Sequence, residues 1–412
     1  MIESMIIKAH RAAVGLRGAS ERQVKAALKA LAELLEAAPG ALLRANAADV
    51  ARVDAADPRR DRLLLTGPRV AAIASGVRKI GRLPDPSGRV IGRQVLANGL
   101  RVEKLAVPLG VVGAIYESRP NVTFDIAALC LRSRNGCLLK GSREAAATNR
   151  AAIGMIRKAL KAGGLPPDCV VLLPPGREVV QELMTATRWV DVIIPRGSDA
   201  LIRYIRANSL VPVIETGAGV CHVYVESAAD LDMAVRIVVN AKVSRPSVCN
   251  AMDTLVVDRA VAAKLLGRLR GPFEQHGVEI FADAAARRLL RGYPLLREAT
   301  EADFGREWLS LKCAIRVVKD MDAALAHIGR YSTRHSEAIV SRNKARCERF
   351  LAEVDAAAVY ANASTRFTDG DELGLGAEIG ISTQKLHARG PFALEKLVTE
   401  KWVMRGNGQI RG

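Results

Sequence analysis

Cys249 is the residue of this sequence best placed for covalent chemistry. It follows an Arg-Pro pair, Arg245 and Pro246, and precedes an apolar run at residues 254–257 that is typical of a β-strand. A thiol between the end of a helix and the start of a strand is well placed to face a cleft. The neighbouring cations of Lys242 and Arg245 would favour its thiolate, which is the nucleophilic form. The pattern indicates a candidate nucleophile, and a small buried hydrophobic residue stays open as the alternative.

The other cysteines give no sign of disulfides or of a structural metal. The chain has seven cysteines, and they are widely spaced, without a CxxC pair or a Cys/His cluster of zinc-finger spacing. We therefore expect no metal site and no disulfide framework. Reduced thiols that fill the core are expected at the remaining positions: Cys130, Cys137, Cys169, Cys221, Cys313 and Cys347.

A second stretch that could bind a ligand is IPRGS, residues 194–198. Gly197 lets the backbone approach a ligand, and the N–H groups at the start of the helix that follows Ser198 favour a phosphate. Arg196 adds a cation beside them. An ordinary capped turn between a strand and a helix remains the alternative, because no GxGxxG or Walker motif is present.

Two series of strands alternating with helices would position these residues. Near-continuous apolar strands that alternate with helices predict parallel sheets covered on both faces. Ligands of such sheets bind beyond the carboxyl ends of the strands. The first series of apolar runs is 111–116, 137–140, 170–173, 190–194 and 211–214. The run 221–226 and a helix from Leu231 follow it, and the second series, after the Cys249 segment, is 254–257, 278–281, 313–318, 337–341 and 357–361.

The segment before the first series predicts helices and one hairpin. Ser20 and Gln23 form a possible capping box for a helix over residues 20–37. Residues 89–97 and 100–107 are extended runs joined by Asn98-Gly99, which predicts a hairpin with a two-residue turn. Such a hairpin either protrudes and pairs with another subunit or folds back on its own domain. The last forty residues read as Gly-rich and irregular.

Length and composition describe a globular protein of two or three domains. The chain has 412 residues, 49% of them hydrophobic and 25% charged. The net charge of +18 attracts anions, but the basic residues are scattered and aromatic residues make up only 4%, so we expect no nucleic-acid partner. No apolar run reaches the length of a membrane span and no signal peptide is evident, so we expect a cytoplasmic protein without a membrane partner.

Five stretches together give the sequence a specific resemblance. They are VPLGVVGAIYESRPNVT (107–123), IIPRGSDALIRYI (193–205), GVCHVYV (219–225), SRPSVCNAMDTLVV (244–257) and VYANASTRFTDGDELGLGAEIGISTQKLHARGP (359–391). In this order and over essentially the whole chain, the sequence resembles the gamma-glutamyl phosphate reductase family of the aldehyde dehydrogenase superfamily.

The resemblance implies an α/β fold with two doubly wound parallel-sheet domains and a protruding oligomerisation hairpin. A nucleotide-binding domain is expected at residues 1–88 and 108–240, and a catalytic domain with the nucleophilic cysteine at 241–377. The oligomerisation element is expected at residues 89–107 and about 378–412. A homo-oligomer, either a dimer or a tetramer, is expected in consequence.

The activity implied is NADPH-dependent reduction of L-glutamate 5-phosphate to L-glutamate 5-semialdehyde and phosphate, in proline biosynthesis. The semialdehyde then cyclises to 1-pyrroline-5-carboxylate. An acyl phosphate suits a cysteine nucleophile, because a thiolate can displace phosphate and leave a thioester. The alternative is another aldehyde dehydrogenase-like oxidoreductase that acts on a different aldehyde or acyl substrate. Glutamate kinase, which would supply the unstable substrate, is a possible protein partner.

The same resemblance assigns roles to individual residues. Cys249 is the expected nucleophile, and Asn121 the side-chain amide that stabilises the oxyanion together with the Cys249 backbone N–H. Asn121 as a plain helix cap remains the alternative. Lys140 corresponds to a lysine near the adenosine ribose, and a cation at Arg143 suits the 2′-phosphate of NADPH. Gly197 and Ser198 would bind the pyrophosphate, and Glu307 the nicotinamide ribose.

Three arginines in the matching stretches could bind the anions of the substrate: Arg119, Arg245 and Arg366. Which arginine binds which anion stays open. Glu215 lies near the position where aldehyde dehydrogenases carry a glutamate that activates water, and here either a structural role or proton donation to the product is possible. His222 and His335 also lie in matching stretches, where a hydrogen-bonded core position and a functional role both stay open.

Overall fold

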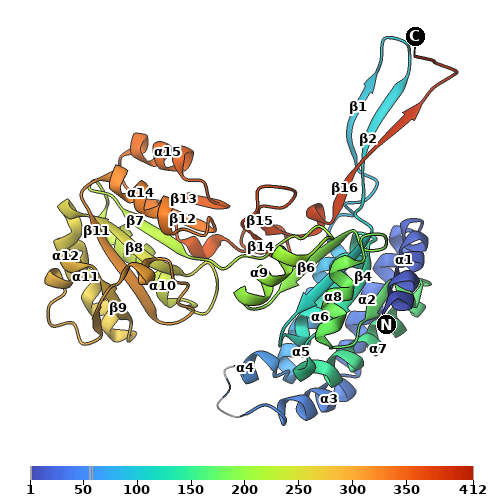
Figure 1. The fold of residues 1–412 in the computed structure, drawn as a ribbon, viewed down its shortest axis with the longest axis horizontal. Coiled ribbons are helices and arrows are strands. Elements are labelled where there is room, and N and C mark those ends of the chain that lie inside the picture. The colour runs from blue at the N-terminus through green and yellow to red at the C-terminus, as the bar shows by residue number, and fades with distance from the viewer. Residues whose placement is uncertain (1, 55–56, 58, 412) are drawn as a thin grey trace. The chain divides into compact units, whose positions relative to one another are not determined.

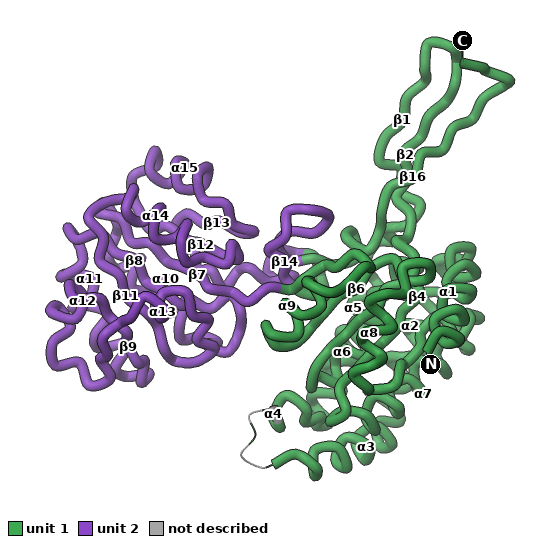
Figure 2. The backbone as a smooth tube through the Cα atoms, viewed as in Figure 1, with its two compact units in different colours: residues 1–216, 375–380, 392–412 green, residues 217–374, 381–391 purple. Residues whose placement is uncertain are grey.

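The computed structural model describes residues 2–54, 57 and 59–411 of the chain. These residues fold into two compact units (Figure 2). Unit 1 comprises Met1–Thr216, Leu375–Gly380 and Phe392–Gly412, and unit 2 comprises Gly217–Gly374 and Ile381–Pro391. The boundary that we expected after residue 240 thus falls after Thr216, because the strand that follows Gly217 pairs within the sheet of unit 2.

Unit 1 begins with helices, and their caps follow the sequence. The expected capping box is present, since the Ser20 hydroxyl accepts from the Gln23 N–H and the Gln23 side chain accepts from the Ser20 N–H. Thr66 caps the fifth helix in a similar way. The helices are α1 (Glu3–Arg17), α2 (Glu21–Ala37), α3 (Gly40–Val50), α4 (Arg59–Leu63) and α5 (Gly67–Arg82).

A parallel sheet with strand order β5-β4-β3-β6 forms the centre of unit 1. Helices α1, α8 and α9 pack against one core of apolar residues on this sheet. Helices α6 and α7 also contact its strands, and α2 and α5 pack on these two helices. The run at 211–214, expected as a strand, contributes only an isolated bridge between Val213 and Ile193. The elements are β3 (Val111–Tyr116), α6 (Pro120–Arg132), β4 (Gly136–Lys140), α7 (Ala146–Ala162), β5 (Val170–Leu172), α8 (Arg177–Thr185), β6 (Val192–Arg196) and α9 (Asp199–Asn208).

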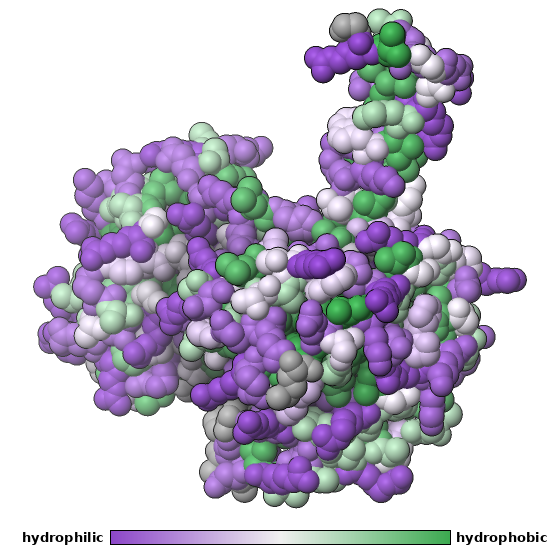
Figure 3. All heavy atoms as spheres, turned by 45° about the vertical axis from the view of Figure 1, so that its right-hand side comes forward, coloured by the Kyte–Doolittle hydropathy of each residue, from purple (hydrophilic) through white to green (hydrophobic). Residues whose placement is uncertain are grey.

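An antiparallel sheet protrudes from unit 1 (Figure 1). The expected hairpin forms its strands β1 (Val90–Val95) and β2 (Arg101–Pro108), and the C-terminal strand β16 (Val398–Arg405) pairs with β2. The sequence suggested an irregular C-terminal segment, but this segment contains a strand. Apolar side chains lie exposed along this sheet (Figure 3), among them Val95 at 68%, Trp402 at 54% and Met404 at 59%.

The turn of the hairpin differs from the expected two-residue turn. The Leu96 N–H donates to the Leu100 carbonyl, and the Gly99 N–H donates to the Leu96 carbonyl, so three residues form the loop. Gly99 has φ +81°, whereas Asn98 keeps a negative φ, and its side chain accepts from the Leu100 N–H. This is a type I turn closed by a left-handed glycine, the usual three-residue hairpin loop.

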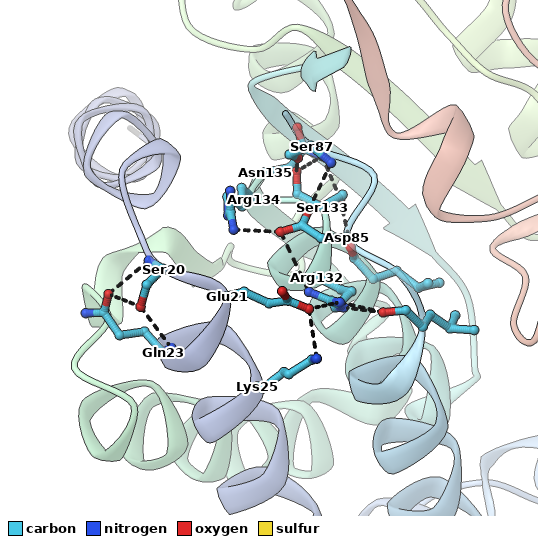
Figure 4. A network of polar contacts seen from close by, with 12 residues as sticks. Ser20, Glu21, Gln23, Lys25, Asp85, Ser87, Arg132, Ser133, Arg134 and Asn135 are labelled. Carbon is cyan, nitrogen blue, oxygen red and sulfur yellow. Dashed lines mark hydrogen bonds and ion pairs between the residues drawn. The ribbon is translucent and has the colours of Figure 1, made fainter. Parts of the chain in front are cut away.

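The base of the protruding sheet is tied to α6 by a buried polar network (Figure 4). The guanidinium of Arg132, which is fully buried, donates from Nε to the Leu83 carbonyl at 2.9 Å and pairs with Glu21 at 3.0 Å. Asn135, which follows the end of α6, donates to the Leu397 carbonyl and accepts from the Gly110 N–H, both at 2.8 Å. These bonds fix the segments that lead into β1 and β16 and the segment that leaves β2.

We expect Arg132→Leu to destabilise unit 1 by about 3 kcal/mol, because it leaves the Leu83 carbonyl without its Arg132 donor and breaks the pair between this buried guanidinium and Glu21. Chemical denaturation followed by circular dichroism measures the loss. Arg157→Leu is the matched control, since Arg157 makes an exposed pair with Asp168, which is worth at most about 1 kcal/mol. Equal losses in the two variants would contradict the structural role of Arg132.

Unit 2 contains a second parallel sheet, with strand order β10-β9-β11-β8-β7-β12-β13 among the residues described. Each neighbouring pair is parallel, so the expected α/β class is confirmed for both units. The elements are β7 (Cys221–Val225), α10 (Leu231–Val243), β8 (Met252–Asp258), α11 (Arg259–Gln275), β9 (Glu279–Ala282), α12 (Ala284–Leu289), β10 (Leu296–Glu298), α13 (Glu301–Phe304), β11 (Lys312–Val318), α14 (Met321–Tyr331), β12 (Ser336–Val340), α15 (Lys344–Glu353) and β13 (Ala358–Ala361).

Helices cover both faces of the unit 2 sheet. One apolar core joins alternate strand residues such as Val223 and Leu255 to α10, α11 and α12. The other joins Tyr224 and Val256 to α14 and α15. This is the doubly wound arrangement expected from the sequence. The chain then returns through the short pair β14 (Gly380–Ser382) and β15 (Gly390–Phe392).

Among the residues described, no helix is both long enough and apolar enough to cross a bilayer.

Candidate functional site

Cys249 lies in the turn between α10 and β8, at the amino end of the central strand of unit 2. Strands β7 and β11 pair with β8, and β12 pairs with β7, all in parallel, so the loops that precede these strands belong to this edge. The general expectation of a site at the carboxyl ends therefore does not describe unit 2. At that opposite edge, Glu226 and Asp258 already accept bonds from Ser341, Ser227 and Tyr224.

The backbone of Cys249 is held from two directions. Its carbonyl accepts a bond from the Cys221 thiol, with Sγ and O 3.1 Å apart. Gly219 lies so close that a Cβ atom there would stand 1.8 Å from the same carbonyl oxygen, so any side chain at this position would displace the turn. The Glu307 carboxylate accepts from the Gly219 N–H at 2.9 Å. Glu307, which we expected at the cofactor, thus bonds to the residue that lies against the Cys249 carbonyl.

The thiol of Cys249 is the one partly exposed thiol among the seven cysteines, all of which are described. Burial raises the pKa of three of the other thiols, to about 12 for Cys169 and Cys313 and well above the usual range for Cys221. A buried thiol with a raised pKa is a poor nucleophile. The expected core-filling role therefore fits these cysteines, and Cys249 is the accessible one.

Lys242 does not support Cys249 as the sequence suggested. Its side chain is fully buried, donates to the Ser310 carbonyl at 3.2 Å and lies 3.8 Å from an Asp253 oxygen. Burial lowers the pKa of Lys242 and raises that of Asp253 to about 7. Asp253 also accepts from the Trp308 N–H at 2.9 Å. The pair thus anchors the 307–310 loop.

Arg366 is the cation that the structure brings to the Cys249 turn. Its guanidinium bonds to the side chain of Asn250, the residue after Cys249, and to the hydroxyl of Ser244. Arg245 follows Ser244 directly and is exposed. Two of the three arginines expected to bind substrate are therefore grouped at the candidate nucleophile, although they are 121 positions apart in the sequence.

The two histidines of the matching stretches are buried in unit 2. His222 Nδ1 lies 3.0 Å from a Glu337 oxygen. His335 Nδ1 lies 2.7 Å from the Ser336 hydroxyl and 3.6 Å from the Cys221 sulfur. Burial lowers the pKa of His335 to about 4, which keeps it neutral at neutral pH. These contacts fit the core position that was weighed for both histidines.

The remaining candidates lie in unit 1. Asn121 is the second residue of α6 and does not cap it; its amide donates to Asp125 at 3.0 Å, and its side chain is exposed. Burial raises the pKa of Asp125 to about 6, against the effects of Asn121 and Arg196. Arg119 precedes α6 and is exposed. Glu215 is buried and pairs with Arg206 at 3.4 Å.

Four expected cofactor residues lie at the carboxyl ends of β4 and β6, the two strands that flank β3 in the unit 1 sheet. Lys140 is the last residue of β4, and Arg143 is exposed on the turn after it. Gly197 and Ser198 follow β6 at the start of α9, where the Ser198 hydroxyl accepts from the Leu201 N–H. Burial lowers the pKa of Lys140, while Glu117 raises it, which places that carboxylate near the lysine.

Glu117 is the residue of this group that sequence reasoning missed. It follows β3, and its carboxylate accepts from the Ser198 N–H at 2.8 Å. A Cβ atom on Gly197 would lie 2.5 Å from the same carboxylate. An anion therefore already occupies the N-terminus of α9, which is what the N–H groups and the helix dipole favour. The available signal was its place in YESRP, before an expected site residue.

Comparison with known proteins gives a consistent result over the whole chain. The sequence model of the Aldehyde dehydrogenase family matches residues 1–280. The gamma-glutamyl phosphate reductase of Pelodictyon phaeoclathratiforme is 48% identical over 100% of this chain and 99% of its own. The enzyme of the same name from Chlorobaculum parvum is 51% identical over 95% of this chain and 94% of its own.

The chain belongs to the gamma-glutamyl phosphate reductase family. Solved structures agree with this membership. The gamma-glutamyl phosphate reductase of Thermotoga maritima has a TM-score of 0.95 and 41% identity, covering 99% of each chain. An acetylating aldehyde dehydrogenase of Geobacillus thermoglucosidasius shares the fold at 18% identity, with a TM-score of 0.72. The resemblance stated from the sequence and the aldehyde dehydrogenase-like fold are thus confirmed.

We expect Glu117→Gln to tighten binding of a phosphate-bearing nucleotide at Ser198, because it removes the carboxylate that competes for the same N–H. The dissociation constant should fall by about three- to tenfold in calorimetry with NADP, while the melting temperature falls slightly, since an anion at a helix N-terminus contributes about 0.3–1 kcal/mol. Glu178→Gln, on the neighbouring α8, is the control. Weaker binding by Glu117→Gln would contradict the competition.

Proposed function

We propose that this chain reduces L-glutamate 5-phosphate to L-glutamate 5-semialdehyde and phosphate with NADPH, through a thioester on Cys249. The observation that carries the proposal is the Cys249 turn itself. It holds the accessible thiol of the chain beside two cations, Arg245 and Arg366, in a member of the gamma-glutamyl phosphate reductase family. A thiol beside cations is a stronger nucleophile, and cations also bind an anionic substrate.

The covalent step follows from the chemistry of an acyl phosphate. The Cys249 thiolate forms a bond to the acyl carbon, the bond from that carbon to the phosphate oxygen breaks, and phosphate leaves with the electron pair. NADPH, when bound, supplies the hydride that reduces the acyl group to the aldehyde. The C–S bond then breaks as the aldehyde is released, and the sulfur takes the electron pair, which regenerates the thiolate. Asn121 and the Cys249 N–H are the proposed donors to the oxyanion.

The residues of unit 1 fit a nicotinamide dinucleotide, the cofactor class of the aldehyde dehydrogenase family. The N–H groups at Ser198 already bind a carboxylate, so this position accepts anions such as a pyrophosphate. Lys140 and the exposed Arg143 add cations on the turn after β4. In this proposal, Arg143 selects NADPH by its 2′-phosphate, and Glu307 is assigned to the nicotinamide ribose.

The protruding sheet is the proposed oligomerisation element of a dimer or tetramer. The outer edge of its strand β1 has no strand partner among the described residues. The apolar side chains of Val95 on β1 and of Trp402 and Met404 on β16 are exposed. An exposed edge with apolar side chains favours pairing with another strand.

Phosphate-dependent reduction of NADP by glutamate semialdehyde, measured at 340 nm, tests the proposed function in reverse. Wild-type protein should produce NADPH only when phosphate is present. Cys249→Ser should lower the rate on the order of a thousandfold or more, because the hydroxyl is not a nucleophile under these conditions. Cys347→Ser, at a buried position far along the chain, should keep the rate. Full activity of Cys249→Ser would rule out the thioester.

Arg143→Glu should reverse the preference of the enzyme from NADPH towards NADH. A charge-assisted bond to the 2′-phosphate is worth about 1.5–3 kcal/mol, so kcat/KM for NADPH should fall by about ten- to a hundredfold. The value for NADH should stay the same or rise. Arg150→Glu, at an exposed position on the following helix α7, is the matched charge change. A preference unchanged in Arg143→Glu but altered in the control would overturn the assignment.

A further inference from the structure

The guanidinium of Arg366 is fixed to the residue that follows the nucleophile. The Asn250 side chain, which is 3% exposed, accepts from Arg366 Nη1 with its oxygen. With its nitrogen it donates to the Thr368 carbonyl at 2.9 Å and to the Arg366 carbonyl at 3.3 Å. The Thr365 hydroxyl closes the arrangement by donating to the Asn250 carbonyl at 2.7 Å. The 365–368 turn and the Cys249 turn therefore form one rigid pair.

A second contact orients the same guanidinium towards the end of α10. Arg366 Nε donates to the Ser244 hydroxyl at 3.2 Å. Both acceptors of Arg366, the amide of Asn250 and the hydroxyl of Ser244, are neutral. These bonds therefore set the direction of the guanidinium without cancelling its positive charge.

Arg245 places a second guanidinium beside the first. It follows Ser244 directly, at the exposed side of the turn. Burial lowers the pKa of Arg366, and the charge of Arg245 lowers it further, whereas Asp369, the Cys249 thiolate and Glu372 act in the opposite direction. Arg245 and Arg366 repel one another at the Cys249 turn, so an anion that binds both of them stabilises the pair.

The substrate offers two kinds of anion, and their positions differ. The phosphate is attached to the carbon that the sulfur attacks, so it lies next to the sulfur when the thioester forms. The α-carboxylate lies at the opposite end of the glutamyl chain, beyond two methylene groups. A cation that is fixed to the backbone neighbour of the nucleophile therefore matches the phosphate. This reasoning rests on the proposed function.

We propose that Arg366, oriented by Asn250 and Ser244, binds the phosphate of the acyl phosphate, with Arg245 as the second cation. The pair binds the phosphate dianion as the sulfur displaces it, and takes up the negative charge that moves onto the departing oxygen. In the reverse reaction, the same pair binds inorganic phosphate before it attacks the thioester. Asn250 and Ser244 are positioning residues for Arg366.

The reverse reaction separates the two anions, because phosphate and semialdehyde are added independently. We measure KM for inorganic phosphate and KM for the semialdehyde with wild type, Arg366→Gln and Arg366→Lys. Arg366→Gln should raise KM for phosphate by about tenfold or more and leave KM for the semialdehyde within about twofold. Arg366→Lys should give an intermediate value, since it keeps the charge and loses the two-pronged geometry.

Two further variants test the contacts. Ser244→Ala should raise KM for phosphate by about two- to threefold, because it removes the acceptor of Arg366 Nε. Arg268→Gln is the matched control, since Arg268 makes an exposed pair with Asp232, and it should leave both KM values unchanged. A rise in KM for the semialdehyde alone in Arg366→Gln would assign Arg366 to the α-carboxylate and overturn the proposal, as would no change in either KM.

A measurement without turnover covers a variant that folds but is inactive. Iodoacetamide should alkylate Cys249 ahead of the buried cysteines, and inorganic phosphate should slow this alkylation in wild type. The protection should be lost in Arg366→Gln and kept in Arg268→Gln. Equal protection in Arg366→Gln and wild type would overturn the proposal. Failure of wild type to reduce NADP with semialdehyde and phosphate would instead refute the proposed function itself.

Discussion

The carbonyl group of Cys249 is the point on which the unit 2 site depends. The neighbouring segments are anchored to the backbone at this turn, while the thiol remains partly exposed for chemistry. The Cys221 thiol donates to the carbonyl, and Gly219 approaches it so closely that no side chain fits. The constraint therefore acts on the backbone of the turn that carries the sulfur.

A buried ion pair also supports the Cys249 turn. Removing charges from water costs several kcal/mol per ion, so a pair such as Lys242 and Asp253 persists only where further hydrogen bonds compensate. Asp253 accepts from the Trp308 and Cys221 N–H groups, and Lys242 donates to the Ser310 carbonyl. The pair therefore joins three segments to α10: the starts of β7 and β8 and the loop that precedes β11. Glu307 is carried by one of these segments and bonds to Gly219, which connects the expected cofactor residue to the support of the nucleophile.

Local signals in the sequence predicted local structure well, and non-local pairing limited the rest. The capping box at Ser20 and the alternation of apolar runs with helices required only neighbouring residues. The predicted domain boundary differs from the observed one, because the assignment of β7 to a unit depends on its pairing with β8 and β12. Strand β16 was missed because most of its residues are exposed on both faces, which leaves no apolar alternation to detect.

Site residues show the same division between what is local and what is not. The position of Cys249 between a helix and a strand was evident from its neighbours, but the direction of the Lys242 side chain was not. Its four-carbon stem allows the ammonium to reach Asp253 in the core, eleven positions away, instead of the adjacent thiol. Glu117 and Asn250 carry no motif of their own, and only contacts with Ser198 and Arg366 reveal them.

The excess of basic residues makes the partners of each arginine more informative than its presence. With 61 lysines and arginines in the chain, a cation near an expected site has little significance by itself. Arg349 pairs with two carboxylates, Asp322 and Glu353, and its charge is thereby neutralised within the fold. The bonds that hold Arg366, in contrast, go to an amide and a hydroxyl, which orient a guanidinium and leave its charge available. Neutral partners at a rigid turn therefore distinguish an arginine kept for an anionic ligand from one that completes an ion pair.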